Sequence, residues 1–80
     1  MSGGTEKLEA LLAEVLRLPP SMIRDDLAMK DVESWDSLNH MELVGSVEGA
    51  FGVELTFDEI VAMTTVGAIK QTLMQKGVVR

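Results

Sequence analysis

The strongest constraint on the fold is a set of apolar residues near the start of the chain that recurs with the period of an α-helix. Its members are Leu8, Leu11, Leu12, Val15 and Leu16. Spacings of three and four residues place all of them on one side of a helix. Each such side chain contributes roughly 1.5–3 kcal/mol when it is fully buried, so this helix should anchor the domain. Thr5 is a suitable N-cap, and Pro19 and Pro20 end the helix because Pro disfavours helical geometry in the preceding residue.

A second helix is predicted between Asp36 and Phe51, with Asp36 as its N-cap and Ser34 as the alternative cap. Gly52 supplies the left-handed residue that ends it. At about 100° per residue, one sector of about 120° collects an apolar face suited to the core. The members of this face are Leu43, Val44, Val47, Ala50 and Phe51.

The opposite side of this helix is also partly apolar. Leu38 and Met41 lie there, beside Glu42 and Glu48. Single exposed apolar residues are ordinary on protein surfaces, but two together that face away from a core are typical of an interaction surface. Ser37, the first hydroxyl of the helix, lies next to this surface.

Two further helices and a long connection complete the prediction. A capping box over residues 56–59 starts a short third helix that runs to Met63. Thr65 caps a fourth helix, which has Val66, Ile69 and Leu73 on its inner side and ends at Gly77. The connection over residues 18–35 is long enough to need anchoring. We expect a short helical turn near residues 21–24 and anchors at Ile23, Leu27 and Val32.

No segment shows the alternation of a β-strand. The sequence therefore predicts an all-α four-helix bundle, with three long helices and one short third helix. We expect residues 1–80 to form a single domain in which residues 1–4 are disordered. The N-terminus lacks the apolar run of a signal peptide, and no stretch approaches membrane-spanning length. The chain is expected to be soluble, cytoplasmic and monomeric.

Composition excludes several kinds of chemistry. The 80 residues contain no cysteine, so disulfides and thiolate ligands are absent, and one histidine with no tyrosine leaves little for acid–base catalysis. The formal net charge is −6, and the segment from Asp31 to Glu59 contains eight acidic residues and no Lys or Arg. Such a segment repels nucleic acid and attracts a basic partner.

A motif at the start of the second helix indicates a family. It reads Asp36-Ser37-Leu38 and is followed by Glu42-Leu43. The match continues through Phe51, Gly52-Val53-Glu54-Leu55, Asp58-Glu59 and Thr64-Thr65 to Ile69. With these residues the chain resembles carrier proteins, which include the acyl carrier proteins of fatty-acid and polyketide synthesis and the peptidyl carrier domains.

The residues before the motif differ from the usual ones. Primary fatty-acid carriers usually have Gly-Ala directly before the motif and peptidyl carriers have Gly-Gly, whereas this chain has Glu33-Ser34-Trp35. In this it resembles the free-standing, specialised carriers of secondary metabolism. Gly45 and Gly49 stand where the family often has a bulky residue and an acid.

The resemblance implies a covalent cofactor on Ser37. In the family this serine receives 4′-phosphopantetheine from coenzyme A, and the thiol of that group holds acyl or aminoacyl intermediates as thioesters. The protein would not be an enzyme. Its partners would be a phosphopantetheinyl transferase, an acyl- or aminoacyl-loading ligase, and downstream synthase or transferase enzymes with basic docking patches. On position alone, the favoured interpretation of Ser37 is an ordinary exposed residue at a helix start, and the family resemblance reverses this preference.

The resemblance also implies a docking surface on the second helix, formed by Asp36, Leu38, Met41, Glu42 and Glu48. In related carriers the acid before the serine helps the transferase to dock and to place its magnesium ion. We further expect an aliphatic cargo to enter between the second and third helices. The residues expected to line that pocket are Val47, Phe51, Ile60 and Met63.

The third helix is expected to contribute few apolar anchors, namely Phe57, Ile60, Val61 and Met63. The methionines at positions 22, 29, 63 and 74 are interpreted as core filler.

The same residues allow three other functional interpretations, a hydrolase, a calcium site and a non-covalent adaptor. A hydrolase would need His40 as the base for Ser37, but no third group and no nucleophile elbow are present, and His40 points toward the rim of the core. The acids at positions 25, 26, 31, 33 and 36 lack the spacing of a calcium loop, so no metal site is predicted. The competing function is a non-covalent acidic adaptor that binds a basic protein through the same helix.

Overall fold

Four α-helices and two short 3₁₀ turns make up the computed structural model, which describes residues 5–79. The helices are α1 (Thr5–Leu16), α2 (Ser37–Phe51), α3 (Phe57–Ala62) and α4 (Val66–Gln75), and the turns are η1 (Pro20–Met22) and η2 (Met29–Asp31). The described residues form no β-strand. The predicted four-helix fold with a short third helix is confirmed. Residues 1–4, which were expected to be disordered, lie outside the described residues.

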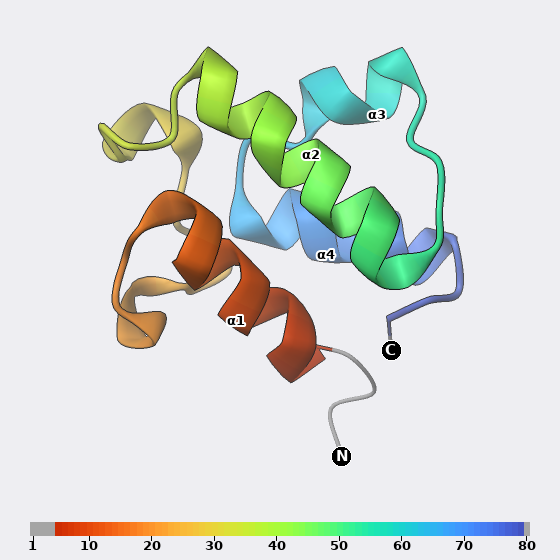
Figure 1. Cartoon of the computed structure of the whole chain (residues 1–80), viewed down its shortest axis with the longest axis horizontal. Coiled ribbons are helices and arrows are strands. Elements are labelled where there is room, and N and C mark those ends of the chain that lie inside the picture. Colours follow the sequence, from red (N-terminus) through yellow and green to blue (C-terminus); the bar gives the residue numbers. More distant parts are fainter. Residues whose placement is uncertain (1–4, 80) are drawn as a thin grey trace.

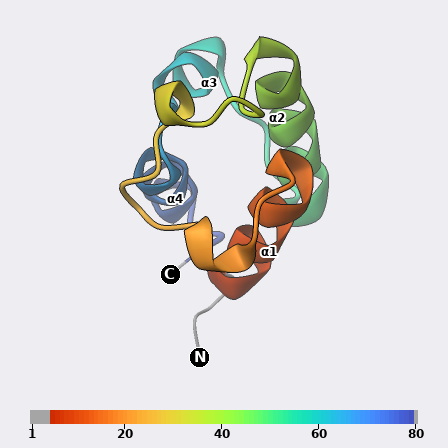
Figure 2. The ribbon, with the colours of Figure 1, turned by 90° about the vertical axis from the view of Figure 1, so that its left-hand side faces the viewer.

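The helices surround one apolar interior. In Figure 1, α1 and α2 lie side by side at the front, α4 crosses behind α2, and α3 lies at the top. The side view in Figure 2 shows the four helices arranged around a common centre. The side chains that fill this centre come from all of the long helices and from the loops, and the fully buried ones are Leu8, Leu12, Leu16, Trp35, Leu43, Val47, Met63, Val66, Ile69 and Leu73.

The faces of α1 and α2 are buried nearly as predicted, with small rotations. On α1, Leu11 and Val15 are only half-buried, and Ala13 is buried instead. On α2, Leu43, Val44 and Val47 are buried, whereas Ala50 and Phe51 are half-buried. At this end of α2, Lys7 Nζ of α1 donates a hydrogen bond of 2.9 Å to Ala50 O. The same ammonium lies 5.1 Å from the centroid of the Phe51 ring, a favourable cation–π contact.

Local side-chain hydrogen bonds define the helix ends. Thr65 accepts from Ala68 N at 3.0 Å, and Gly52 ends α2 with a left-handed φ of 66°. Thr56 and Glu59 form the predicted capping box. The N–H of Thr56 donates to the Glu59 carboxylate, and this contact, with Lys76 as the next contributor, holds the pKa of Glu59 below its usual value. The predicted caps of α2, α3 and α4 are confirmed.

The long connection between α1 and α2 is anchored at several points. Ile23 and Val32 are buried as predicted, and Leu27 is half-buried. An isolated β-bridge between Ala28 and Thr65 adds a tie that the sequence did not reveal. In it, Met29 N donates to Thr64 O at 2.8 Å, and Val66 N donates to Leu27 O at 3.0 Å. The connection is therefore attached to the segment between α3 and α4.

Lys70 of α4 joins three parts of the chain. Its Nζ donates to Glu9 Oε2 of α1 at 2.8 Å and to Asp25 Oδ1 of the connection at 2.7 Å. Burial lowers the pKa of Lys70, but the hydrogen bonds to the Asp25 and Glu9 carboxylates outweigh this effect and leave the pKa raised. The ammonium thus remains charged between its two carboxylate partners.

Two of the methionines interpreted as core filler are not in the core. Met22 is 44% exposed and Met74 is 49% exposed, because η1 and the outer side of α4 place them at the surface. Met63 is fully buried and Met29 is half-buried. No helix among residues 5–79 has the combined length and apolar character needed to cross a membrane.

Candidate functional site: the Ser37 turn

Ser37 is the first residue of α2, and the residue before it caps the helix. Asp36 has an extended backbone with φ −96°, and its Oδ1 accepts a hydrogen bond of 2.9 Å from Asn39 N. Ser34, the alternative cap, instead donates its hydroxyl to Leu16 O at 2.7 Å. Asp36 is therefore the N-cap, and Ser34 attaches the turn to the end of α1.

The Ser37 hydroxyl is exposed, and no hydrogen bond to it occurs within residues 5–79. The first intrahelical hydrogen bond runs from His40 N to Asp36 O at 2.8 Å. The N–H groups of Ser37 and Leu38 precede this bond, so they have no intrahelical acceptor. They lie at the positive end of the helix dipole, where a phosphodiester on the serine oxygen is electrostatically favoured.

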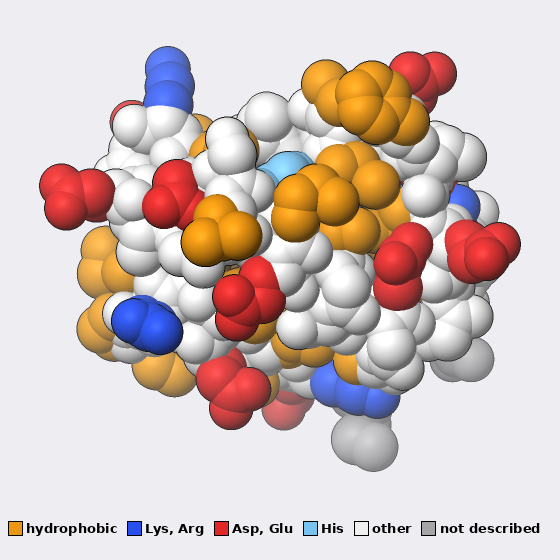
Figure 3. Space-filling view, turned by 45° about the horizontal axis from the view of Figure 1, so that its top comes forward, with side chains coloured by type: hydrophobic (Ala, Val, Ile, Leu, Met, Phe, Trp, Pro, Cys, Tyr) orange, Lys and Arg blue, Asp and Glu red, His pale blue; other side chains and the backbone are white. Residues whose placement is uncertain are grey.

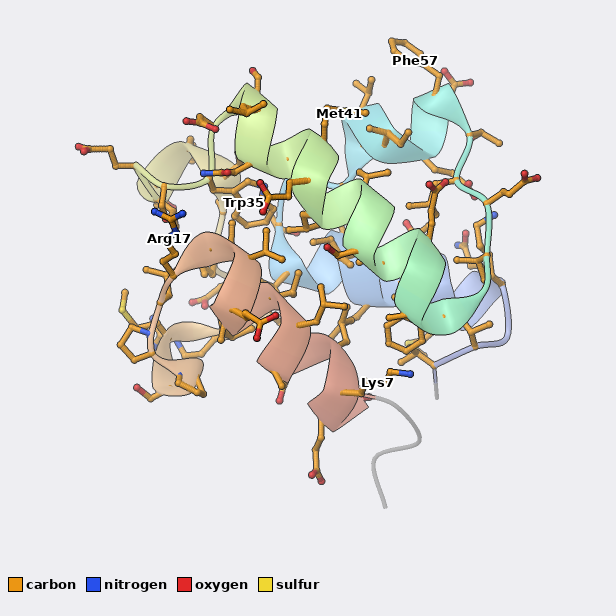
Figure 4. The ribbon with its side chains drawn as sticks, in the orientation of Figure 1. Lys7, Arg17, Trp35, Met41 and Phe57 are labelled. Carbon is orange, nitrogen blue, oxygen red and sulfur yellow. The ribbon has the colours of Figure 1, made fainter. Side chains whose placement is uncertain are left out.

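The backbone around this hydroxyl is held rigidly. Asn39 Nδ2 donates to Ser34 O at 2.7 Å, which closes the turn. The Trp35 side chain is only 1% exposed and lies beneath the N-terminal half of α2 in Figure 4. The result is an accessible hydroxyl on a turn that is held by hydrogen bonds and by a buried side chain. The roles of Trp35 and Asn39 were not foreseen from the sequence.

His40 is a structural histidine. It is 8% exposed; its Nδ1 accepts from Trp35 Nε1 at 3.0 Å and its Nε2 lies 2.8 Å from Ile60 O. Both ring nitrogens are thus occupied by partners other than Ser37. A hydrolytic role for the Ser37–His40 pair has no free base in this arrangement.

The apolar surface beside Ser37 spans two helices. On α2, Leu38 is 77% exposed and Met41 is 55% exposed, so their predicted exposure is confirmed. On α3, Phe57 is 78% exposed and Val61 is 57% exposed. We call these four side chains the α2–α3 face. Figure 3 shows hydrophobic side chains gathered here with acidic ones around them, and in Figure 4 Phe57 points away from the body of the protein.

The expectation that Phe57 and Val61 anchor α3 to the core is wrong. The helix uses Ile60, which is half-buried, and Met63 directly after its end, which is fully buried. Phe57 and Val61 are four residues apart and share the outer side of the helix. That spacing of four residues was the sequence signal that Phe57 and Val61 share a side of the helix different from that of Ile60 and Met63.

Glu48 is not the free surface acid that its position on α2 suggested. Its Oε2 accepts a hydrogen bond of 2.9 Å from Leu55 N, and the residue is only partly exposed. The reason is that the chain turns back at Gly52 and brings the N–H of Leu55 over the last turns of α2. Glu42 remains exposed, as predicted.

The space between the residues expected to line a cargo pocket is closed in this structure. Val47 and Met63 are fully buried, and Phe51 and Ile60 are half-buried. A separate pocket of about 420 Å³ lies at the junction of η2 with the segment between α3 and α4. It is lined by Ala28, Met29, Lys30, Thr64 and Thr65. Within residues 5–79, no group of three or more His, Asp or Glu side chains is arranged to hold a metal ion.

Comparisons with known proteins identify the family. A family model described as a phosphopantetheine attachment site matches residues 6–73. A non-reducing polyketide synthase of Monascus ruber is 41% identical over 58 residues, which are 72% of this chain but only 2% of the synthase. An acyl carrier protein of Saccharopolyspora erythraea is 29% identical over 66 residues, which are 82% of this chain and 70% of that protein.

The chain therefore belongs to the phosphopantetheine-attachment family. Its covalent prosthetic group is 4′-phosphopantetheine, and it is a carrier protein rather than an enzyme. Carriers of this family work with a phosphopantetheinyl transferase and with synthase enzymes.

The different surroundings of Glu48 and Glu42 predict different effects on stability. Glu48→Ala should lower the free energy of unfolding by about 1–2 kcal/mol, because it leaves the partly buried N–H of Leu55 without its charged acceptor. Glu42→Ala, on the same helix but fully solvated, should change it by less than about 0.5 kcal/mol. Urea denaturation of the two variants and the wild type measures the difference. Equal free energies for both variants would contradict the structural role of Glu48.

Proposed function

We propose that Ser37 is the attachment residue for 4′-phosphopantetheine and that the chain presents acyl or aminoacyl thioesters to biosynthetic enzymes. The observation that carries this proposal is the exposed, unbonded Ser37 hydroxyl at the positive end of a fifteen-residue helix. When attached, the group supplies a thiol that holds the cargo as a thioester. The protein's own contribution is to keep the serine oxygen accessible and the turn around it fixed.

The other described serines are poorer candidates. Ser34 is engaged with Leu16 O, and Ser46 is half-buried within α2. Ser21 is exposed, but it belongs to the three-residue turn η1, which has no helix dipole of useful length. Among the serines of residues 5–79, only Ser37 combines access with the electrostatic environment that a phosphodiester favours.

Replacement of Ser37 should therefore abolish modification without unfolding the protein. We expect Ser37→Ala to gain no prosthetic-group mass when it is incubated with coenzyme A, magnesium and a promiscuous phosphopantetheinyl transferase. Its free energy of unfolding should change by less than about 1 kcal/mol, because the side chain is exposed. Ser21→Ala is the matched control and should be modified like the wild type in intact-mass spectra.

Modification of the alanine variant at position 37 would show that another residue is the attachment site. A wild type that gains no mass would favour the alternative function, a non-covalent acidic adaptor that binds a basic partner.

The α2–α3 face is the surface that we propose for docking of the partner enzymes. Asp36 and Glu42 are exposed beside Leu38 and Met41, and α3 contributes Phe57 and Val61. The absence of Lys and Arg between residues 31 and 59 leaves this region acidic. It suits an apolar patch with a basic rim on the transferase, on a loading ligase and on downstream synthases, each of which binds a monomeric carrier. Glu48 takes less part, because its carboxylate holds Leu55.

Charge reversal on this face should slow productive encounter with a basic partner. Glu42→Lys should lower kcat/KM for modification by the transferase at low ionic strength, and the loss should shrink as salt screens the interaction. Glu14→Lys makes the same change of charge at an exposed position of α1 and is the matched control. Equal losses for both variants, or a loss that is independent of salt, would argue against electrostatic docking on this face.

We further propose that an aliphatic cargo is accommodated by movement of α3. This helix has six residues and no fully buried side chain of its own. It is held by its capping box, by the 3.0 Å ion pair between Glu59 and Lys76, and by the contact of Ile60 O with His40. Such a helix can shift at lower cost than the others. Movement would open the space between α2 and α3 beside Val47, Phe51, Ile60 and Met63.

A series of attached acyl chains of increasing length tests the cargo proposal. Each buried methylene contributes roughly 0.8 kcal/mol, less the cost of separating the helices, so the melting temperature should rise with chain length. Chemical shifts should move at Val47 and Ile60. Shifts at Ala28 and Thr64 instead would place the cargo in the pocket beside η2, and a flat series with no shifts would indicate a small or aminoacyl cargo held in solvent.

A further inference from the structure

The two nitrogens of His40 have opposite hydrogen-bonding roles. The indole N–H of Trp35 can only donate, so His40 Nδ1, at 3.0 Å from it, must present a lone pair. The carbonyl of Ile60 can only accept, so His40 Nε2, at 2.8 Å, must carry the proton. These two contacts are satisfied together by one form of the ring, which is the neutral imidazole protonated on Nε2.

This bridge connects the Ser37 turn to α3. Trp35 lies two residues before Ser37 and His40 lies three residues after it, so the bond between their side chains spans the candidate attachment residue. The rings of Trp35 and His40 also stack, with centroids 6.2 Å apart. The far end of the bridge is the carbonyl of Ile60, in the last turn of α3. Within residues 5–79, it is the side-chain hydrogen bond that joins the body of α2 directly to α3.

We propose that His40 is a positioning residue for reactions at Ser37: its neutral ring fixes the Ser37 turn to α3, and protonation of the ring or displacement of α3 releases the turn. The proposal rests on Ser37 being the attachment residue. It makes the geometry of the attachment turn depend on the position of α3, which is the helix that we expect to move when cargo enters.

Protonation would break the Trp35 end of the bridge, whereas Nε2 would keep its proton and its contact with Ile60 O. An imidazolium has an N–H on both nitrogens, so Nδ1 would then present a donor to the donor of Trp35. Trp35 is 1% exposed, and its indole N–H would be left buried and unpaired, which is unfavourable.

The surrounding charged groups offer no replacement partner. The Asp36 carboxylate caps Asn39, and Glu59 is paired with Thr56 N and Lys76. Asp31 and Glu33, in the loop that precedes Trp35, are exposed. His40 takes part in none of the ion pairs found within residues 5–79.

Substitutions can separate the two bonds. His40→Asn keeps an acceptor near the position of Nδ1 but is too short to reach Ile60. His40→Gln extends a donor toward Ile60 but places no acceptor at Nδ1. His40→Leu removes both bonds, and none of the three side chains titrates. Trp35→Phe removes the donor while leaving His40 in place. Circular dichroism selects the variants that keep the helical content of the wild type.

The bridge itself is tested by nitrogen chemical shifts, independently of any modification. In the apo protein, the His40 ring should show the tautomer protonated on Nε2. Because Trp35 is the single tryptophan, its indole N–H signal and its fluorescence report on one site. Both should change together with the His40 signals as the pH is lowered. The opposite tautomer, or an indole signal that does not follow the protonation of His40, would overturn the proposal.

The positioning role is tested by the rate of modification as a function of pH. Where the ring is neutral, the transferase should modify the wild type about three- to tenfold faster than the Leu variant, the size expected from the loss of one or two buried hydrogen bonds. As the ring becomes protonated, the wild-type rate should fall toward that of the Gln variant, which likewise keeps a donor toward Ile60 O but has no acceptor for Trp35. The modification rates of the Asn, Gln and Leu variants should keep constant ratios to one another as the pH changes. A ratio of two rates measured at the same pH cancels the pH dependence of the transferase.

The outcomes separate this inference from the proposed function. If wild type is modified but its rate relative to the Leu variant does not change with pH, His40 is only a structural residue and the positioning role is overturned. In that case the assignment of Ser37 stands. If wild type is not modified at any pH, the assignment of Ser37 fails, and the positioning role fails with it.

Discussion

Burial of the Trp35 side chain is the contact on which the Ser37 turn depends. The segment before α2 has no regular secondary structure of its own, so it needs an anchor to define where the helix starts. The indole supplies that anchor, because it is almost completely buried and its polar atom is paired with His40. Ser34 and Asn39 then close the turn around it. An exposed hydroxyl is thereby placed between two buried side chains, which explains how Ser37 can be both accessible and fixed.

Helix α3 combines two properties that rarely occur in one element. Its attachment to the rest of the protein is weak, since it is short and relies on Ile60, on Met63 directly after its end, on one ion pair and on one hydrogen bond from His40. Its outer side is strongly apolar, because Phe57 and Val61 are exposed. A rigid core helix would normally show the reverse of both. These two properties support the proposals that α3 moves to admit cargo and that its outer side takes part in docking.

Local features were predictable from the sequence, and contacts between distant segments were not. The caps at Asp36, Thr56 and Thr65 depend on side chains that bond to backbone groups three residues away, so their patterns are visible in the chain. The stripe of α1 was also visible, although helical periodicity could not show that Ala13 rather than Leu11 and Val15 would be buried.

The pairing of Trp35 with His40 and Ile60, the bond from Leu55 to Glu48, and the outward position of Phe57 all depend on how separate elements pack. The motif beginning at Asp36, by contrast, located the candidate site from the sequence, because the motif lies within one helical turn. The support beneath the site comes from three segments, and only the folded structure brings them together.

The bridge made by Lys70 has a consequence for the order in which the protein acquires its structure. Its partner Glu9 is 61 residues away along the chain, so this contact closes a large loop and is costly to form early. During synthesis, α4 emerges after all the elements that it must hold together. Until Lys70 arrives, the carboxylates of Glu9 and Asp25 have no cation between them, and the connection that carries Asp25 lacks this tie to α1. Docking of α4 is therefore the step that adds this tie between α1 and the connection that carries Asp25.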